Sequence, residues 1–294
     1  MKRIRHARIR LSLLFLGLLL LAADGILLLS GARFGGAALT GETEAHFIDV
    51  GQGDATLLLS GGEAVLIDAG EAEAGETVAA YLENLGVKRL LAVVATHPHA
   101  DHIGGIPSVL DNFEVENFYM GGDVTTTKTY GDLLETLERQ GLRPIVPTPG
   151  DELAFASGAV LTFLGPYDDV PADNLNDRSL VCLFRAGDTR VLLMGDAEQD
   201  AEDSLLRHHP FLACNVLKAG HHGSDTSTSK RFLSRIRPET AVISCGQNNI
   251  YGHPSPQTLE TLSAESVHNI HITAEEGTVV LPLGEPPMDK ENAA

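Results

Sequence analysis

The sequence contains no tryptophan, and its aromatic residues make up only 5% of 294 residues. A chain so poor in aromatic side chains lacks the stacking platform on which single-stranded nucleic acid binds. Basic residues are also scarce, since 21 Lys and Arg face 40 Asp and Glu. Because phosphate backbones are held by Lys and Arg, this deficit excludes a broad surface that coats nucleic acid. A small cationic site, such as a metal centre, is still compatible with this composition.

Cysteine is sparse as well, with only Cys182, Cys214 and Cys245 in the whole chain. An odd, sparse set of this kind is not a disulfide framework. Cys182 and Cys214 lie in apolar stretches, which is typical of small buried side chains. The three also lack the spacing of metal-binding cysteines, so any metal ligands must be sought among His, Asp and Glu.

The first 32 residues differ from the rest in charge. Residues 1–30 hold five bases and one acid, which leaves 16 bases and 39 acids in residues 31–294. An apolar run from Leu11 to Leu29, interrupted at Asp24, follows the basic residues. This pattern predicts a signal peptide or membrane anchor over residues 1–32, with the rest of the chain outside the membrane. We therefore expect the protein to contact the membrane through this segment, on the extracellular face of the cell membrane, or to be secreted.

Beyond this segment the sequence predicts one domain. Residues 33–43 have the composition of a linker, residues 44–285 show no second boundary, and residues 286–294 predict a frayed tail. Gly-rich turns separate short apolar runs, which predicts antiparallel strands over residues 45–50, 55–59 and 64–68. Helix-like and strand-like segments alternate further along, in two similar β-rich halves. The pattern favours an α/β sandwich with polar loops, and a site, along one edge.

The strongest chemical signal is the segment His97-Pro98-His99-Ala100-Asp101-His102, which directly follows an apolar strand. Imidazole and carboxylate are the ligands that zinc, manganese and iron accept. His97 and His99 can point the same way from an extended loop, while Asp101 and His102 can turn to the other side. One short loop can thus serve two metal ions, and Gly104-Gly105 allows a helix to pack close to it.

Two later loops supply partners for this segment. Asp196 ends an apolar strand, where its carboxylate can bridge two cations about 3.5–4 Å apart. The pair His221-His222 again follows an apolar strand, and one of the two, which we expect to be His222, completes the shell of the second metal. His221 is then free to contact substrate. His253, between Gly252 and Pro254, is a further candidate for contacting a phosphate or protonating a leaving group.

These motifs, together with Ile67-Asp68-Ala69-Gly70 and His221-His222-Gly223-Ser224, resemble the metallo-β-lactamase superfamily. Within it, the chain resembles the hydrolase domain of the ComEC competence-protein branch. The stretches that carry the second resemblance are 47–55, 176–181, 217–224 and 251–256. The resemblance implies an αββα four-layer sandwich with a one- or two-metal site at its edge. We expect two divalent ions, zinc or alternatively manganese.

The resemblance also implies roles for further residues. His97, His99 and Asp196 would hold the first metal, and Asp101, His102, Asp196 and His222 the second. Asp68 would brace the histidine loop, and Asp54 would be a second brace or a turn residue. Many members of the superfamily place a third His on the first metal, but no His lies between His102 and His208 here. Asn176 and Ser179 occupy the corresponding stretch, as substrate-orienting or bracing residues.

The function predicted from these patterns is metal-dependent hydrolysis by a metal-activated water. By resemblance the bond is a phosphodiester, as in a phosphodiesterase or nuclease-like enzyme, with Asp101, His221 and His253 as catalytic residues. A lactonase or β-lactam-type hydrolase is the alternative enzyme, and a non-catalytic, surface-anchored metal-binding module is the alternative outside enzymes. The acidic domain favours a small phosphodiester or nucleotide-type substrate, and nucleic acid would be gripped at the metal centre and not through a broad basic surface.

Overall fold

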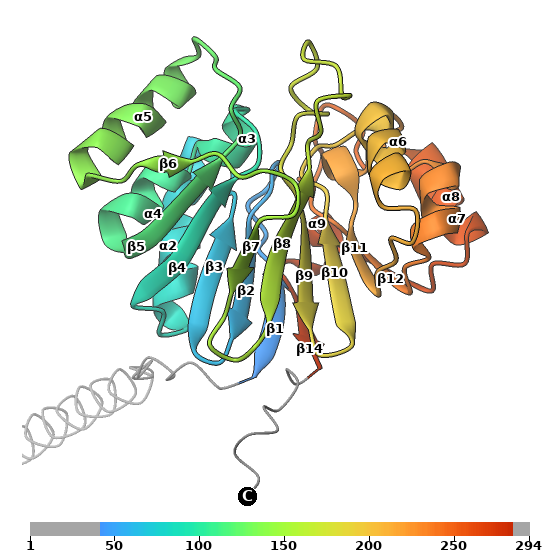
Figure 1. Ribbon diagram of the computed structural model, residues 1–294, viewed down its shortest axis with the longest axis horizontal. Coiled ribbons are helices and arrows are strands. Elements are labelled where there is room, and N and C mark those ends of the chain that lie inside the picture. The colour runs from blue at the N-terminus through green and yellow to red at the C-terminus, as the bar shows by residue number, and fades with distance from the viewer. Residues whose placement is uncertain (1–41, 285–294) are drawn as a thin grey trace, which may run out of the picture. The chain divides into compact units, whose positions relative to one another are not determined.

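The structure, a computed structural model, describes residues 42–284, so the predicted anchor at 1–32, most of the linker and the predicted tail lie outside the described residues. Two seven-stranded sheets form the centre of the fold (Figure 1). The first has the order β14-β1-β2-β3-β4-β5-β6, and the second has the order β13-β12-β11-β10-β9-β8-β7. Among residues 42–284, no helix combines the length and apolarity needed to cross a membrane.

The strands of the first sheet come mainly from the first half of the chain. They are β1 (Thr43–Phe47), β2 (Thr56–Ser60), β3 (Glu63–Ile67), β4 (Arg89–Ala95), β5 (Glu114–Met120), β6 (Pro144–Ile145) and β14 (Val279–Leu283). The strands of the second sheet are β7 (Glu152–Ala154), β8 (Val160–Gly165), β9 (Val181–Ala186), β10 (Thr189–Leu193), β11 (Val216–Lys218), β12 (Thr240–Ile243) and β13 (Asn269–Ile272). The expected antiparallel pairing of the first three strands is confirmed.

Helices cover the outer faces of both sheets (Figure 1). Those of the first half are η1 (Ala72–Ala74), α2 (Gly75–Asn84), α3 (Ala100–Ile103), α4 (Ile106–Asn112) and α5 (Lys128–Gln140). Those of the second half are α6 (Gln199–His208), η2 (Gly220–Gly223), α7 (Lys230–Ile236), α8 (Pro256–Ala264) and α9 (Thr273–Glu276). Helix α5 shows how the sequence sets such an element: Thr127 caps its first turn, and Gly141, with φ of 68°, ends it.

Three apolar clusters make the layers. Phe47 and Val94 of the first sheet meet Phe163 and Phe184 of the second in a cluster between the sheets. A second cluster joins the outer face of the first sheet to α2, α4 and α5, and a third joins the second sheet to α6, α7 and α8. The order helix, sheet, sheet, helix is the predicted four-layer arrangement, with two sheets of the α/β type.

One difference from the expected division into halves lies at the end of the chain. Strand β14 returns to the first sheet and pairs antiparallel with β1, so that Thr43 is opposite Leu283. Strand β5, which the sequence reading missed, carries two glutamates and an asparagine among its seven residues and therefore lacks a plain apolar pattern.

The parallel strands bring the site together. Strands β3 and β4 are parallel in the first sheet, and β10, β11 and β12 are parallel in the second. The loops that follow them carry Asp68, His97, Asp196, His222 and Ser244. Because the carboxyl ends of parallel strands meet at one edge of a sheet, these side chains lie along the edge where the two sheets meet.

Close packing behind the histidine loop depends on Gly105, as the Gly104-Gly105 pair suggested. A Cβ atom on Gly105 would lie 2.1 Å from the carbonyl oxygen of Ala69, and its neighbour Gly104 lies against the backbone of Ala72. Since a backbone oxygen cannot move aside cheaply, even one methyl group would separate the loop from η1 and α2.

We expect Gly105→Ala to destabilise the protein by about 1–3 kcal/mol, a fall in Tm of several degrees, because of this overpacking. Gly131→Ala is the matched control, since Gly131 lies in α5 with nothing within 4 Å of its added Cβ. That change should stabilise the helix by about 0.5–1 kcal/mol. Thermal unfolding followed by circular dichroism measures both, and equal effects of the two changes would contradict the packing argument.

Candidate metal centre

Asp68 braces the histidine loop from beneath. Its Oδ1 accepts the backbone N–H of Thr96 at 2.8 Å, and its Oδ2 accepts the Thr96 hydroxyl at 2.6 Å. The same Oδ2 lies 2.8 Å from Nδ1 of His102. Because a carboxylate is an acceptor, Nδ1 of His102 carries the donated proton, and Nε2 is left to face the site. The pKa of Asp68 is raised by burial, against the opposing effect of His102.

The first group of candidate ligands consists of His97, His99 and Asp196. Nε2 of His97 lies 2.9 Å from Nδ1 of His99 and 3.7 Å from Oδ2 of Asp196. Burial, reinforced by the charge of His102, lowers the pKa of His97 well below its ordinary value. A neutral imidazole is the form that binds a metal.

Ser179 links the two halves of this first group. Its hydroxyl lies 3.3 Å from Nδ1 of His97 and accepts the backbone N–H of Asp196 at 3.1 Å. The hydroxyl thus contacts His97 through Nδ1, the ring nitrogen opposite the one near Asp196, and Asp196 through its backbone. Ser179 therefore has the bracing position that the sequence allowed for it.

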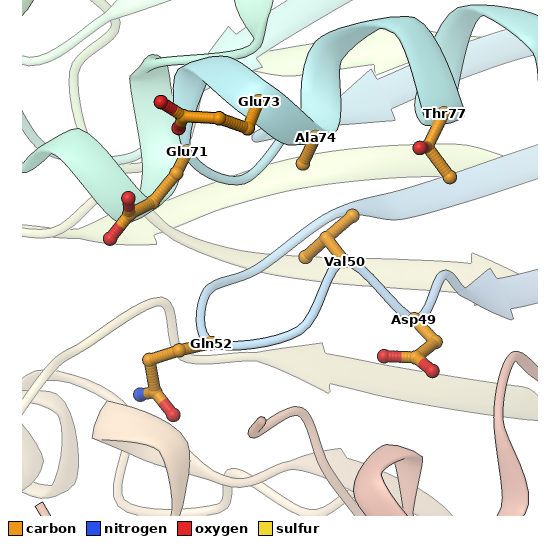
Figure 2. Close-up of a pocket in the computed structure, with 7 residues that line it drawn as sticks. All are labelled: Asp49, Val50, Gln52, Glu71, Glu73, Ala74 and Thr77. Carbon is orange, nitrogen blue, oxygen red and sulfur yellow. The ribbon is translucent and has the colours of Figure 1, made fainter. Parts of the chain in front are cut away.

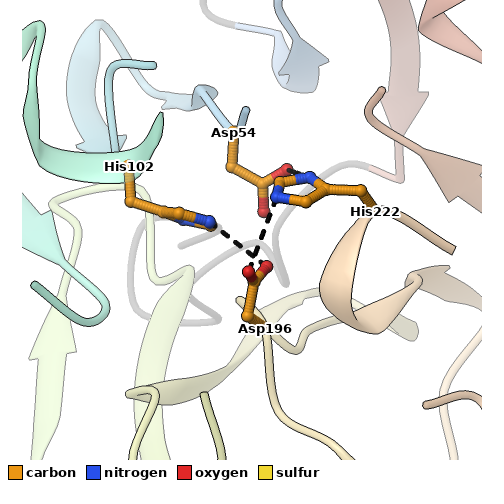
Figure 3. A group of neighbouring side chains, drawn as sticks. All are labelled: Asp54, His102, Asp196 and His222. Carbon is orange, nitrogen blue, oxygen red and sulfur yellow. Dashed lines mark ion pairs between the residues drawn. The ribbon is translucent and has the colours of Figure 1, made fainter. Parts of the chain in front are cut away.

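The second group consists of Asp54, His102, Asp196 and His222, all buried (Figure 3). Nε2 of His102 lies 3.2 Å from Oδ1 of Asp196, and Nε2 of His222 lies 3.5 Å from Oδ2 of the same carboxylate. Nδ1 of His222 is 3.0 Å from the carbonyl oxygen of Ser244, so this nitrogen is the donor and Nε2 faces the site. The loop that carries His221 and His222 places both at positive φ, 47° and 54°, a conformation that non-glycine residues rarely adopt.

The donor atoms of this second group fit a cation. Asp54 Oδ1, His102 Nε2, Asp196 Oδ1 and His222 Nε2 are buried and have no hydrogen-bond partner in the structure. Buried polar atoms are nearly always paired, so several orphaned donors and acceptors facing one another point to a ligand that satisfies them together. Mixed imidazole and carboxylate donors suit zinc, manganese or iron. Asp196 belongs to both groups, so the arrangement is a potential two-metal site, whose metal identity is open.

Asp101 lies beside the second group. Its Oδ2 lies 3.2 Å from Nε2 of His222, but the four-residue group includes Asp54 in its place. The Asp101 side chain is 25% exposed, whereas that of Asp54 is 6% exposed. Although burial alone would raise it, the pKa of Asp101 is held well below its ordinary value by His222 and His102. Its role as a metal ligand stays a prediction, and it lies on the open side of the site.

A buried lysine stands behind Asp54. Lys218, at the end of β11, is 2% exposed, and its Nζ lies 2.6 Å from Oδ2 of Asp54. The other oxygen of Asp54 lies 3.4 Å from Nδ1 of His222. Burial alone would raise the pKa of Asp54, but the charges of Lys218 and His222 lower it to about 2.

His221 is held by a residue that sequence reasoning missed. Its Nδ1 lies 2.8 Å from Oε1 of Glu198, and its Nε2 lies 3.9 Å from Oδ2 of Asp196. Glu198 also accepts the hydroxyl of Thr226 at 2.7 Å, and the side-chain amide of Asn176 lies 3.4 Å from it. Although burial acts against it, these bonds lower the pKa of Glu198 to about 2. The signal in the sequence was its place two residues after Asp196, in the same acidic loop.

An open pocket of about 320 Å³ lies over the centre. Asp101, Asn176, His221 and His253 line it together with ligands of both groups. The ring of His253 is 5.4 Å from that of His221, and burial and the neighbouring imidazoles lower its pKa. The residues predicted as metal ligands, catalytic residues and substrate contacts thus converge on one place, with Asp68 and Ser179 behind it.

A second pocket of about 530 Å³ adjoins the first (Figure 2). Gln52 and Glu71 line both, and Asp49 and Glu73 add further acids to the second. Burial and the nearby charge of Asp101 raise the pKa of Glu71. No lysine or arginine is among the residues that line either pocket.

Two helix-covered sheets with paired groups of His and Asp at their common edge are the arrangement of the metallo-beta-lactamase fold. The chain matches the metallo-beta-lactamase superfamily over residues 48–247, and it belongs to this superfamily. It is also 31% identical over 261 residues to ComE operon protein 3 of Bacillus subtilis (strain 168). The alignment covers 82% of this chain and 33% of that protein. The predicted resemblance to competence proteins is thereby confirmed.

Two further comparisons agree with the fold. Recombination protein 2 of Haemophilus influenzae is 32% identical over 220 residues, 73% of this chain and 26% of that protein. The chain therefore spans about a third or less of the length of these two relatives. Among solved structures, CmlA, a diiron beta-hydroxylase from Streptomyces venezuelae, aligns with a TM-score of 0.55 at 13% identity, covering 83% of this chain and 55% of that one. At that identity the likeness shows the fold alone.

We expect the zinc-loaded protein to hold two ions per chain. His97→Ala should reduce the metal content to about one ion per chain, because it removes a donor from the first group only. Asp196→Ala should remove both ions, because both groups share that carboxylate. Metal analysis after desalting measures the count. His268→Ala, at an exposed histidine outside both groups, is the control. Retention of two ions by the Asp196→Ala protein would contradict the shared site.

Proposed function

We propose that the protein is a metal-dependent phosphodiesterase that acts on small phosphodiesters or nucleotide-type substrates. The observation that carries this proposal is the shared carboxylate Asp196 between two groups of histidine ligands, at the floor of an open pocket. Divalent ions bound there lower the pKa of a bound water and neutralise charge that develops on the phosphoryl oxygens. Zinc is the proposed metal, with manganese as the alternative.

The chain's own residues then supply positioning and proton transfer. Asp101 lines the pocket, and its low pKa keeps it ionised, so its carboxylate accepts a hydrogen bond from the attacking water and orients it. His221 is fixed by Glu198 through Nδ1, and in its imidazolium form its Nε2–H donates a proton to the leaving oxygen and leaves the neutral ring. His253 lies beside His221 at the pocket wall and contacts the leaving group.

The surroundings favour a small substrate. Neither pocket is lined by a lysine or arginine, so a phosphate meets positive charge only at the metal centre. The rest of a long polyanion would be repelled by Asp49, Glu71 and Glu73. Nucleic acid remains a candidate only for weak, metal-centred binding, and tight binding of plasmid-length DNA that resists high salt would contradict this choice.

The proposed location follows from the N-terminal segment. Its basic residues and apolar run support attachment to the membrane through residues 1–32, with the acidic domain on the extracellular face or secreted. Protease treatment of intact cells tests this, because a domain inside the cell would be protected from digestion.

The test of the activity compares substrates on one metal-loaded preparation of the full-length chain. We expect turnover of bis-p-nitrophenyl phosphate and of members of a nucleotide panel, after loading with zinc or manganese. A lactone and a β-lactam in the same panel test the alternative hydrolase. Preferential turnover of either would replace the phosphodiester proposal, and bound metal without turnover of any substrate would favour a metal-binding module.

Asp101→Ala should lower kcat for the phosphodiester by at least about 100-fold, because it removes the acceptor that orients the water. Asp188→Ala, in the exposed turn between β9 and β10, is the matched control and should keep full activity. Unchanged activity of the Asp101→Ala protein would refute the role given to this carboxylate.

A further inference from the structure

Lys218 is an unusual residue for its position. It is the only lysine or arginine among the buried side chains of residues 42–284, and it is one of the largest fully buried side chains. Its Nζ contacts Oδ2 of Asp54 at 2.6 Å and donates to the carbonyl oxygen of Ala219 at 2.9 Å. Burial of an ammonium group costs considerable free energy, because the group loses its hydration. An opposite charge and hydrogen bonds must therefore offset that cost.

Asp54 is fixed from three sides. Its backbone N–H donates to the carbonyl oxygen of Asp101 at 3.1 Å, and its own carbonyl accepts from Gly70 at 2.8 Å. Gly53, just before it, packs against the Asp101 backbone with no room for a side chain. With Oδ2 held by Lys218, the carboxylate cannot turn, and Oδ1 stays directed toward the second ligand group without a hydrogen-bond partner.

Buried carboxylates outnumber lysine and arginine side chains around Asp54. Asp54, Asp68 and Asp196 are all buried at the centre. Lys218 is the one fixed cation in contact with this set within residues 42–284, since the lining of the pocket above contains no lysine or arginine. Asp54 thus lies between the ammonium group of Lys218, which contacts Oδ2, and the candidate cation site, which Oδ1 faces.

We propose that Lys218 is a positioning residue that acts as a resident counter-charge for the metal centre. It stabilises Asp54 in the metal-free protein and presents only Oδ1 to the incoming ion. The loop that carries Asp54 and the edge of β11 are therefore in place before a metal binds. Without Lys218, only His222 and the cation at the second group would compensate Asp54, and folding of this region would depend more strongly on the metal.

The inference concerns the metal centre and not the substrate, so it is tested by stability and metal content. Full-length Lys218→Met protein, which keeps the shape of the side chain but loses its charge, is compared with the natural protein, with and without zinc. Circular dichroism follows unfolding, because the chain has no tryptophan for fluorescence. Lys230→Met is the matched control, since that lysine on α7 is 78% exposed and 3.6 Å from Glu265.

In the metal-free state, Lys218→Met should lower Tm by roughly 5–15 °C, the effect of leaving a buried charge unpaired. Zinc should restore at least half of that loss, so the zinc-induced rise in Tm is larger in this variant than in the natural protein. Lys230→Met should show the natural zinc-induced rise. An equal rise in Lys218→Met and the natural protein would overturn the proposal, because a merely packing lysine does not couple to the metal.

A second variant keeps the test decisive if Lys218→Met protein does not fold. In the double variant Lys218→Met with Asp54→Asn, both charges are absent, and the metal-free protein should recover most of the lost Tm. The zinc-induced rise should then be no larger than in the single Asp54→Asn variant. A double variant as unstable as Lys218→Met alone would show that the lost stability does not come from an unpaired Asp54 carboxylate, and would refute the role of Lys218 as a counter-charge.

Discussion

The carboxylate of Asp196 lies where the two sheets meet, and each of its oxygens faces a different set of imidazoles. Oδ1 is 3.2 Å from Nε2 of His102, and Oδ2 is 3.5 Å from Nε2 of His222 and 3.7 Å from Nε2 of His97. Burying such a group is costly unless positive charge compensates it. The rest of the site is arranged to make that compensation possible: strand ends bring the donors together, and Asp68, Ser179 and Ser244 hold them from behind.

The two halves of the chain supply the candidate ligands in different ways. The first half supplies His97, His99 and His102 from one short loop after β4, whereas the second half supplies Asp196 and His222 from two loops of its own sheet. The outer ring nitrogens of His97, His102 and His222 contact Ser179, Asp68 and the Ser244 carbonyl, respectively, and the Asp196 backbone donates to Ser179. These contacts orient the donors before any ion binds. Pre-orientation of this kind favours binding because little freedom is lost on loading.

The sequence predicted the parts of this site that have local patterns. His97, His99 and His102 fall within six residues, and Asp196 and His222 each follow an apolar strand, so a common site was expected at the edge where polar loops follow the strands. The position of Asp54 beside His222 was not predictable, because it depends on how closely Gly53 approaches Asp101 across the fold. The burial of Lys218 was not predictable either, since a lysine at the end of an apolar strand normally reaches solvent. The pairing of β14 with β1, more than 200 residues apart, likewise has no local signal.

That pairing of the first and last strands has a consequence for the architecture of longer proteins. Thr43 and Leu283 are opposite each other, so the polypeptide enters and leaves the domain at neighbouring points, and α3 with its part of the site lies at the far end (Figure 1). A unit with adjacent entry and exit can be spliced into a larger polypeptide, or appended to one, without disturbing the remote edge that carries the candidate metal centre. The geometry makes this domain portable, in keeping with relatives in which the matching region is about a third of the whole length or less.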